Sequence, residues 1–470
     1  MQMFRHVENV SEWQDLPLRG GVRVGSILAV GVDLPRLLSW GPARTVAARH
    51  TRRWAQVFDH LQSSRPGPWS GWTSSYDGRP LPRRQMQDWL RATLERIKAL
   101  EPRRVLEVGC GAGRIARALA PDVESYLGLD ISPAALDALR AGLRADGVRA
   151  GHVDLRLGDH EALARLPGSS FDCIVVNSVV QYLPNLSALQ TLLDSCGRLL
   201  APFGAVFLGD IRDLRLQEAF AGSLAAYQQP QPLSPGALWI DISRRLIEEP
   251  ELLVAPGYFA AAAPWAGAVD LQLKPGRTDN ELFRFRYDVV LRHGPTPSRP
   301  PALVFRGDNA AQALVRALGR AEAPFIRGES FTDLRISPVI EPMSVKRSPR
   351  RGGRRPGGFH PARLFSLGAR HGYRTVVSPA ASHRVDRLDV LFQREASLPG
   401  CSGAPAHGVV ARGALTQEAM TNMPLAAAAL PRLRTAVGER LGGGRPILLV
   451  DALRLEKLQR DAPDWLAHVD

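Results

Sequence analysis

The chain has 470 residues, of which 45% are hydrophobic and 23% charged, so it is long and apolar enough to fold around a sizeable core. It contains no run of about 18 uncharged apolar residues and no apolar segment of signal-peptide length near its start, so we expect neither a membrane span nor secretion. The cysteines form no CxxC pair, which predicts a reducing, cytoplasmic location and no metal site; they are Cys110, Cys173, Cys196 and Cys401.

The formal net charge of +14 indicates an anionic partner, and an acidic protein fits this charge as well as a nucleic acid does. The densest basic run lies between Lys346 and Arg355, among prolines and glycines and without aromatic residues. Arginines without interleaved aromatic residues do not make a surface on which bases stack. We therefore interpret this run as a solvated loop and expect no nucleic-acid partner.

Residues 1–50 show no regular pattern, whereas residues 51–103 predict two amphipathic helices around a turn-rich loop. The second helix extends from about Gln85 to Leu100, and we expect the pair to form a helical lid. The first helix, RRWAQVFDHL, has one apolar face formed by Trp54, Val57, Phe58 and Leu61.

From residue 104 the pattern changes to short apolar runs that alternate with helical segments. The runs are RVLEVG, SYLGLD, VDLRLGD, FDCIVVNS and AVFLGDI. Strands separated by helices predict an α/β domain with right-handed crossovers and a parallel sheet. The later segment LQLKPGRTDNELFRFRYDVVL predicts an antiparallel hairpin at the sheet edge, with Glu281, Arg284 and Arg286 on one face of its second strand.

Two further boundaries follow this core. A proline-rich stretch at 294–302 separates the core, residues 104–293, from a smaller α/β subdomain at 303–395. A linker rich in glycine, proline and alanine at 399–407 then precedes a last fragment, residues 408–470.

The strand RVLEVG leads into a glycine loop that contains Gly109, Cys110, Gly111 and Gly113. Glycines let the backbone turn sharply and approach a ligand closely. A dinucleotide site would need a further glycine where Arg114 stands. The G-x-G-x-G spacing after an acid-containing strand instead predicts a site for S-adenosylmethionine, which has no pyrophosphate.

Acidic residues also end the second and third predicted strands. Asp130, followed by Ile131, lies 17 residues after Gly113, where a carboxylate can accept hydrogen bonds from both ribose hydroxyls. Asp159 is expected to reach the adenine amino group, and His160 to line the adenine. Each acid alone has the ordinary interpretation of a turn or cap residue, but their order along the strand tips favours a cofactor site.

The fourth and fifth predicted strands end in polar groups that we expect around the methyl group and its acceptor. Asn177 ends the fourth strand, Gln181 and Tyr182 lie on the next turn, and Asp210 and Arg212 end the fifth strand. The alternative for Arg212 and Gln181 is a surface ion pair or hydrogen bond. The alternative for Tyr182 is a partly buried core position.

Several segments resemble the methyltransferase domains inserted in the adenylation domains of nonribosomal peptide synthetases. The likeness covers roughly residues 50–395 and implies a Rossmann-like, seven-stranded class I methyltransferase sheet. It also implies S-adenosylmethionine as cofactor, S-adenosylhomocysteine as product, and no metal. The most specific segments are SFDCIVVNSVVQYLPN (170–185) and NELFRFRYDVVL (280–291); the others are WTSSYDGRPLP with QMQDWL (72–90), RVLEVGCGAGRIARALAP (104–121), YLGLDISPAAL (126–136) and VFLGDIRDLRLQEAF (206–220).

The resemblance assigns the methionine end of the cofactor as well. Glu107, or the backbone of Gly109 and Gly111, is implied to fix the methionine amino group. Trp72 and Tyr76 are implied to close over the cofactor as a lid, the alternative being that they only pack the N-terminal helices.

Both ends of the chain extend the likeness. LRGGVRVGSI at 18–27 is similar to the hinge motif of adenylation domains, with its acids replaced. Residues 421–463 are similar to the small C-terminal adenylation subdomain, although the lysine motif is missing as such. We therefore predict that the first 50 residues and the last fragment are vestigial adenylation segments without adenylation activity.

The resemblance implies methyl transfer to the α-amine of an aminoacyl or peptidyl group, held as a thioester on an acidic carrier protein, in nonribosomal peptide biosynthesis. An amine with a pKa of about 7.7–8.0 needs a positioned hydrogen-bond acceptor more than a strong base. Candidates for this catalytic role are Asn177, Tyr182 and Asp210. Candidates for binding the acceptor are Gln181, Arg212 and Glu281.

Three alternatives stay open. Methylation of carbon or oxygen, or of a released small molecule, would use the same cofactor site. A non-catalytic scaffold could bind a synthetase through the adenylation remnants, although the intact glycine loop argues against it. A nucleic-acid methyltransferase is disfavoured, because NSVVQY stands where such enzymes carry a D/N-PP-Y/F motif.

Overall fold

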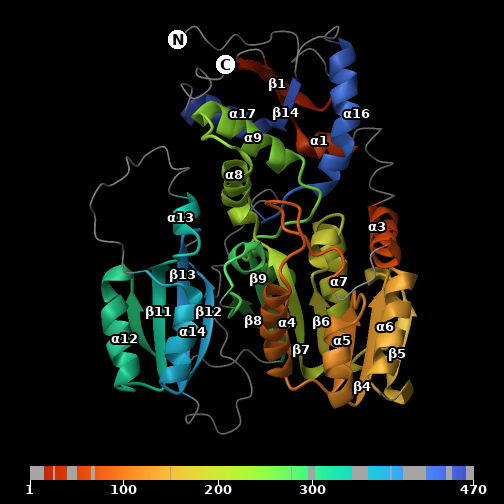
Figure 1. Ribbon diagram of the computed structural model, residues 1–470, viewed down its shortest axis with the longest axis vertical. Helices are drawn as coiled ribbons and strands as arrows, with labels where there is room; N and C mark the ends of the chain where they lie inside the picture. The colour runs from red at the N-terminus through yellow and green to blue at the C-terminus, as the bar shows by residue number, and fades with distance from the viewer. Residues whose placement is uncertain are drawn as a thin grey trace.

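The computed structural model describes residues 15–24, 27–39, 50–64, 69–148, 150–276, 278–294, 302–340, 358–381, 384–394, 420–440 and 447–461. Their strands form three sheets, of seven, four and three strands. In Figure 1 the three-stranded sheet lies at the top, above the seven-stranded sheet, and the four-stranded sheet lies at the lower left.

The seven-stranded sheet has the order β5-β4-β3-β6-β7-β9-β8. Strands β3 to β7 are parallel, whereas β9 runs antiparallel to both β7 and β8. The expected mostly parallel sheet with an antiparallel edge hairpin is therefore confirmed. Its strands are β3 (Arg104–Val108), β4 (Ser125–Asp130), β5 (Val153–Leu157), β6 (Phe171–Asn177), β7 (Leu200–Arg212), β8 (Ala266–Gln272) and β9 (Arg286–His293).

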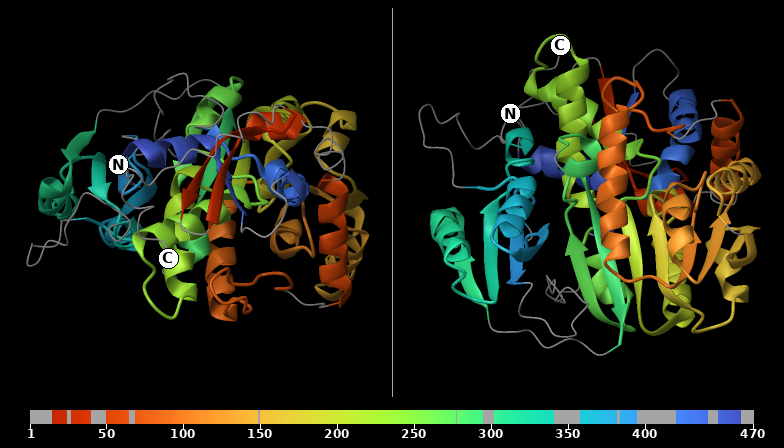
Figure 2. Two further views of the ribbon diagram at one scale, coloured as in Figure 1. Left: turned by 90° about the horizontal axis from the view of Figure 1, so that it is seen from above. Right: turned by 60° about the horizontal axis from the view of Figure 1, so that its bottom comes forward.

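Helices cover both faces of this sheet (Figure 2), because its central strands carry apolar side chains on both sides. Alternate residues of a strand face opposite ways. Thus α4, α5 and α6 pack on the face that carries Val105 and Cys173, whereas α7 and α10 pack on the face that carries Leu106 and Ile174. The helices around this sheet are α3 (His50–Ser64), α4 (Arg83–Lys98), α5 (Arg114–Leu119), α6 (Pro133–Ala145), α7 (Leu186–Leu199), α8 (Gln217–Gln228), α9 (Pro235–Ile247) and α10 (Tyr258–Ala262).

The second strand of the edge hairpin is shorter than predicted. A one-turn helix, α11 (Glu281–Arg284), precedes β9. The reason is local: the Asn280 side chain accepts hydrogen bonds from the backbone N–H groups of Leu282 and Phe283 and so caps a helix. The expectation that Glu281, Arg284 and Arg286 share one strand face is therefore wrong, since only Arg286 belongs to the strand.

The predicted smaller α/β subdomain forms the four-stranded sheet, with the order β10-β11-β13-β12. It lies next to the edge of the large sheet, where the backbone N–H of Leu273 donates to the carbonyl oxygen of Val377 at 2.7 Å. Its elements are β10 (Leu303–Arg306), α12 (Ala311–Gly319), β11 (Phe325–Thr332), α13 (Ser337–Ile340), α14 (Pro361–Arg370), β12 (Tyr373–Pro379) and β13 (Arg387–Arg394).

The two ends of the chain join in one small unit, which we call the terminal subdomain. The expectation of an irregular N-terminal segment is wrong here, because β1 (Leu18–Val24) and β2 (Ile27–Val32) form an antiparallel pair. Strand β14 (Ile447–Asp451), from the other end of the chain, pairs in parallel with β2. The helices of this unit are α1 (Leu34–Ser39), α16 (Pro424–Arg440) and α17 (Ala452–Asp461).

The terminal subdomain packs on helix α9 of the core. Trp239 of α9 is buried against Ala29, Leu448, Val450 and Leu455 of the terminal subdomain. These apolar residues are far apart in the sequence, and they share one core because β2 and β14 pair. Helix α9 is therefore held between α8 of the core and the terminal subdomain (Figure 1).

Some expectations lie outside the described residues. These are the basic run between Lys346 and Arg355, the linker at 399–407 and Cys401. Among the helices that the structure describes, none is both long and apolar enough to cross a membrane.

We predict that Trp239→Ala destabilises the protein by about 3–5 kcal/mol, the usual cost of removing a buried tryptophan side chain. The matched control is Tyr227→Ala, whose side chain is 61% exposed and whose loss should change stability by less than about 0.5 kcal/mol. Chemical denaturation followed by far-ultraviolet circular dichroism measures both. A loss of stability for Trp239→Ala no larger than that of the control would contradict the packing of α9 on the terminal subdomain.

Candidate active site

A cavity of about 650 Å³ lies at the carboxyl ends of the parallel strands. This volume falls in the range of small-molecule sites, about 300–1,000 Å³. The cavity brings together most of the predicted site residues. Those that line it are Glu107, Gly109, Cys110, Gly111, Gly113, Asp130, Ile131, Asp159, His160, Asn177, Gln181, Tyr182, Arg212 and Glu281; Tyr76 and Asp210 do not.

The glycine loop uses backbone conformations that other residues rarely adopt. Gly109 has φ +75°, and a Cβ placed on it would lie 2.3 Å from a methyl carbon of Val179. Gly113 has φ +85°, and a Cβ there would lie 2.0 Å from a methyl carbon of Leu139. Glycine is thus required at both positions by backbone angle and by space, and the loop backbone is exposed to the cavity.

Two carboxyl groups flank this loop. Glu107 is buried and accepts a hydrogen bond from the Tyr126 hydroxyl. Burial raises the pKa of Glu107 to about 8, and repulsion from Asp130 adds to the rise, while the Tyr126 hydrogen bond opposes it. Asp130 accepts from the backbone N–H groups of Gly111 at 2.7 Å and Ser132 at 2.9 Å, and burial raises its pKa too.

Two further charged residues, Asp159 and Arg114, line the cavity. Asp159 accepts from the backbone N–H of Glu161 at 2.9 Å, so it acts as a cap residue while it also lines the cavity. Arg114, which the sequence marked only as a departure from the dinucleotide motif, lines the cavity with its guanidinium 3.8 Å from the centre of the Trp69 ring. Burial lowers the pKa of Arg114 to about 10.

Helix α3 covers the cavity with the apolar face predicted from its sequence. The ring centre of Tyr182 lies 4.6 Å from that of Trp54 and 4.9 Å from that of Phe58. His50 Nε2 lies 2.9 Å from the carbonyl oxygen of Tyr182. Burial raises the pKa of the Tyr182 phenol, and the charge of Glu251 raises it further, so this hydroxyl keeps its proton and remains a hydrogen-bond donor.

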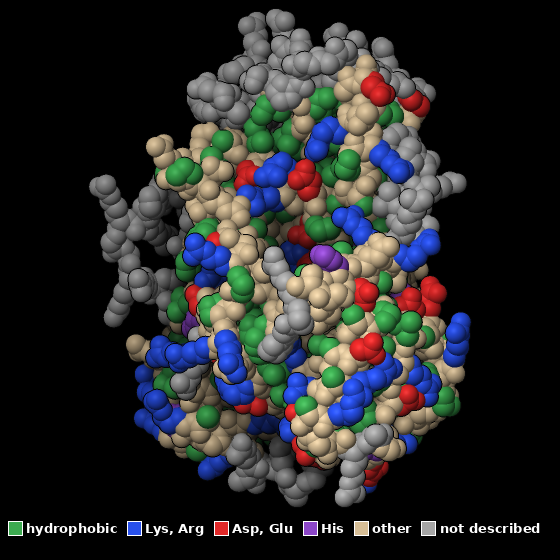
Figure 3. All heavy atoms as spheres, turned by 45° about the vertical axis from the view of Figure 1, so that its right-hand side comes forward, with side chains coloured by type: hydrophobic (Ala, Val, Ile, Leu, Met, Phe, Trp, Pro, Cys, Tyr) green, Lys and Arg blue, Asp and Glu red, His purple; other side chains and the backbone are tan. Residues whose placement is uncertain are grey.

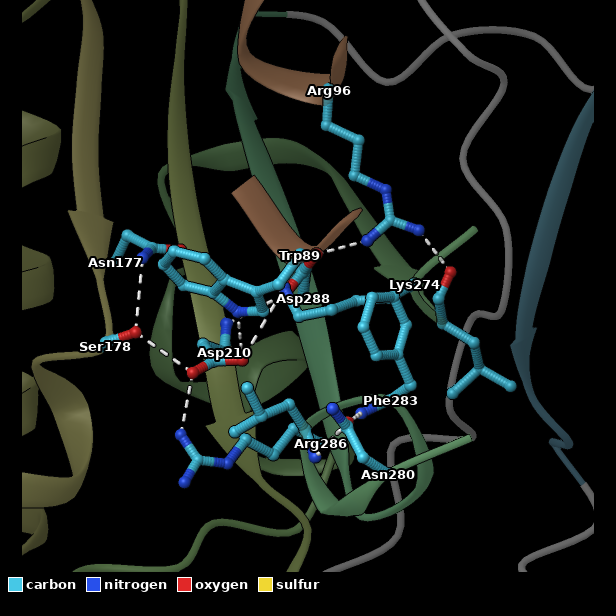
Figure 4. A network of polar contacts seen from close by, with 12 residues as sticks. Trp89, Arg96, Asn177, Ser178, Asp210, Lys274, Asn280, Phe283, Arg286 and Asp288 are labelled. Atoms are coloured by element: carbon cyan, nitrogen blue, oxygen red, sulfur yellow. Dashed lines mark hydrogen bonds and ion pairs between the residues drawn. The ribbon is translucent and has the colours of Figure 1, made fainter. Parts of the chain in front are cut away.

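Asp210 lies beneath the cavity and is fully buried. The register between β7 and β9 shifts between Leu208 and Ile211, and Asp210 has φ +67°, as at a bulge that turns a side chain out of the ladder. Its carboxylate accepts from Trp89 Nε1 at 3.0 Å, Ser178 Oγ at 2.9 Å and Arg286 Nη1 at 2.7 Å (Figure 4).

A second buried carboxylate completes this network. Asp288 Oδ1 accepts from the backbone N–H of Asp210 at 2.7 Å and from Lys274 Nζ at 2.8 Å, and Arg96 pairs with its other oxygen. Lys274 also lies 3.6 Å from Asp210. Although burial raises the pKa of Asp210, Arg286 and Lys274 lower it more, so that it falls below its usual value. Asp210 is therefore a stable carboxylate and a weak base.

Ser178 is a cavity residue that the sequence analysis missed. It has φ +56°, and its Oγ donates to Asp210 while it accepts from Asn177 Nδ2 at 3.2 Å. A hydroxyl oxygen has two acceptor lone pairs, so one remains for a ligand. A serine in the left-handed region is the kind of local strain found at functional sites, but the residue type alone gave no signal.

Arg212 forms an ion pair, which was the alternative to a role in binding the acceptor. This ion pair lies in the cavity wall and not on the open surface. Its guanidinium bonds Glu249 at 2.7 and 2.8 Å and Glu251 at 2.8 Å, with 11% of its side chain exposed. Both glutamates line the cavity. They were missed because the acidic run at 248–251 follows no strand or glycine motif.

Glu281 and Tyr76 have structural partners. Glu281 accepts from the backbone N–H and the hydroxyl of Ser75, at 3.0 and 2.9 Å, so it holds the loop before α4. The Tyr76 hydroxyl lies 2.9 Å from Ser223 Oγ, and its ring packs against Tyr227. Trp72 does line the cavity.

Known proteins are similar to the part of the chain that forms this site. Residues 105–204 match the methyltransferase domain family. A chondramide synthase of Chondromyces crocatus is 36% identical over 265 residues, which cover 54% of this chain and 7% of that protein. A nonribosomal peptide synthetase of Salinispora arenicola is 37% identical over 276 residues, which cover 57% of this chain and 3% of that protein. The chain thus spans a small fraction of the length of these relatives.

Among solved structures, an N-methyltransferase of Bradyrhizobium japonicum in complex with S-adenosylhomocysteine is similar. It is 18% identical, with a TM-score of 0.33, and the match covers 51% of this chain and 97% of that one. A likeness of this strength adds nothing to the sheet order described above.

Proposed function

We propose that this chain, whose residues 105–204 match a methyltransferase domain family, transfers a methyl group from S-adenosylmethionine to the α-amine of a carrier-bound aminoacyl or peptidyl group. The observation that carries the proposal is the cavity at the strand tips, which joins the glycine loop to the polar groups around Ser178. The sequence relatives among nonribosomal peptide synthetases support the substrate class.

The residues fit such a cofactor. The positive-φ glycines leave the loop backbone open to a ligand, and the buried Glu107 offers a carboxyl for the methionine amino group. Asp130 would bind the ribose and Asp159 with His160 the adenine. When bound, S-adenosylmethionine supplies an electrophilic methyl group on its sulfonium sulfur.

The chain's own task is to orient the acceptor. The free lone pair of Ser178 Oγ accepts an N–H of the neutral amine, which leaves the nitrogen lone pair free to attack. Methyl transfer would form the N–C bond as the C–S bond of the bound cofactor breaks, with the electron pair of the C–S bond staying on sulfur and the extra amine proton leaving to water. Asp210 fixes the Ser178 hydroxyl and, as a weak base, is a positioning residue rather than the proton acceptor.

The basic surface of the protein is an argument for an acidic partner. The face in Figure 3 carries many Lys and Arg side chains among fewer Asp and Glu side chains, in line with the net charge of +14. Complementary charge speeds encounter and selects partners more than it adds affinity. An acidic carrier protein of a synthetase is therefore the partner that we propose.

The proposal is tested by titrating the protein with S-adenosylmethionine and then measuring the intact mass of an aminoacylated carrier protein after incubation with both. We expect binding and the gain of one methyl group on the aminoacyl amine. Binding without methylation of the carrier would point to a released product or another acceptor atom. Absence of binding would overturn the enzyme assignment in favour of a scaffold.

We predict that cofactor binding releases a proton near pH 7. The pKa of Glu107 is about 8, so this group is mostly protonated at pH 7; a cationic amino group beside it would lower its pKa and drive its proton off. Titration calorimetry in two buffers of different ionisation enthalpy should give release of about 0.5–1 proton per site. Glu107→Gln should abolish the release and weaken binding, whereas the exposed Glu124→Gln should behave as the wild type.

We predict that Ser178→Ala lowers kcat by about tenfold or more, because a small misplacement of a reacting group can cost about 100-fold in rate. The dissociation constant of S-adenosylmethionine should stay within about twofold, since Ser178 faces the acceptor. Ser170→Ala, at a partly exposed serine whose hydroxyl donates to the Pro167 carbonyl, is the matched control. Full activity of Ser178→Ala would remove this residue from the mechanism.

A further inference from the structure

The terminal subdomain reaches the cavity wall through residues 420–422. This short segment forms an antiparallel bridge, Thr421 with Val254, and the backbone N–H of Ala255 donates to the Met420 carbonyl at 2.8 Å. The segment therefore adds a strand edge to residues 251–255, which follow α9 in the chain. Because Leu253 and Glu251 line the cavity, this edge supports the wall from behind.

Two side chains of the segment strengthen this support. Asn422 Nδ2 donates to the Glu251 carbonyl, and Asn422 Oδ1 accepts from the Leu253 N–H, both at 2.8 Å. Thr421 Oγ1 donates to the Leu253 carbonyl at 2.8 Å. The Asn422 carboxamide thus satisfies a backbone acceptor and a backbone donor at once, as a neighbouring strand would.

The supported loop holds Arg212, which lines the same part of the cavity. Glu249 and Glu251 together bind Arg212 through three hydrogen bonds of 2.7 to 2.8 Å. A largely buried charge depends on its partners, and Glu251 supplies one of the three bonds that hold Arg212. The place of Arg212 in the cavity therefore depends on the backbone that Asn422 holds.

The terminal subdomain fixes the other end of the loop as well. Ile247, the last residue of α9, is buried against residues of α16. Arg434 of α16 bonds Glu248 at 3.1 Å. The loop from 248 to 255 is thus held at its start by α16 and at its end by residues 420–422.

We propose that the terminal subdomain positions the acceptor side of the cavity, with Asn422 as the positioning residue that acts through Glu251 and Arg212. This role rests on the proposed function in one respect: the molecule that this wall binds is taken to be the methyl acceptor. It gives the two adenylation-like ends of the chain a task in the methyltransferase itself. Among the described residues, no hydrogen bond or ion pair joins residues 420–422 to the glycine loop or to Glu107.

The first test is independent of catalysis. In Asn422→Ala, hydrogen exchange of the backbone amides of residues 251–255 should become about tenfold faster or more, while exchange in the glycine loop and the dissociation constant of S-adenosylmethionine stay within about twofold. Thr435→Ala, on the exposed face of α16, is the matched control and should change neither. Unchanged exchange at 251–255 in Asn422→Ala would overturn the proposal.

The second test measures acceptor binding. The probes are aminoacyl N-acetylcysteamine thioesters. The thioester that the wild type methylates fastest is then used for every variant. Asn422→Ala should raise its KM about fivefold or more with a smaller change in kcat. In a Glu251→Gln background the same substitution should raise KM less than about twofold, because residues that act through one another are not additive.

Thr421→Val provides a milder variant if Asn422→Ala folds poorly. It removes only the hydroxyl bond to Leu253 and should raise KM in the same direction by a smaller factor. Equal effects of Asn422→Ala in both backgrounds, or an equal loss of cofactor affinity, would contradict a positioning role. If the wild type methylates no thioester, the proposed function fails, and the exchange experiment still decides whether Asn422 holds the wall.

Discussion

The site depends on two carboxylates buried between β7 and β9. Asp210 and Asp288 are fully buried, and a buried charge is tolerated only when it is paired and hydrogen-bonded. Lys274, Arg286 and Arg96 supply the pairing. This network fixes the bulge at Asp210, and the bulge in turn fixes the direction of the Ser178 hydroxyl. The position of the Ser178 hydroxyl in the cavity wall is thus set from below the cavity.

The rest of the cavity is assembled from segments that are distant in sequence. The parallel sheet gathers the loops after β3, β4, β5 and β6 at one edge, as such sheets do. Helix α3 closes this edge with aromatic side chains against Tyr182. The terminal subdomain supports the wall at residues 251–255 through Asn422.

Local patterns predicted the large sheet well and the details of the site less well. Glycine spacing and the acids at strand tips identified one side of the cavity, because those residues follow directly from strand and loop geometry. The same reasoning placed Asp210 at the acceptor, whereas its carboxylate lies beneath the cavity and reaches it through Ser178. Tyr76 was expected over the cofactor, but its hydroxyl lies against Ser223 instead. Strand position does not tell which way a side chain turns at a bulge.

The sequence by itself determined the alternation of strands and helices, the glycine loop and the apolar face of α3, because each depends on residues within one element. Only the tertiary structure decided that β14 pairs with β2, that Glu249 and Glu251 hold Arg212, and that Asn422 supports their loop. Each of these is a contact between residues far apart along the chain. Such pairs form because burial leaves a backbone or charged group in need of a partner, and the chain order does not say which partner lies nearby.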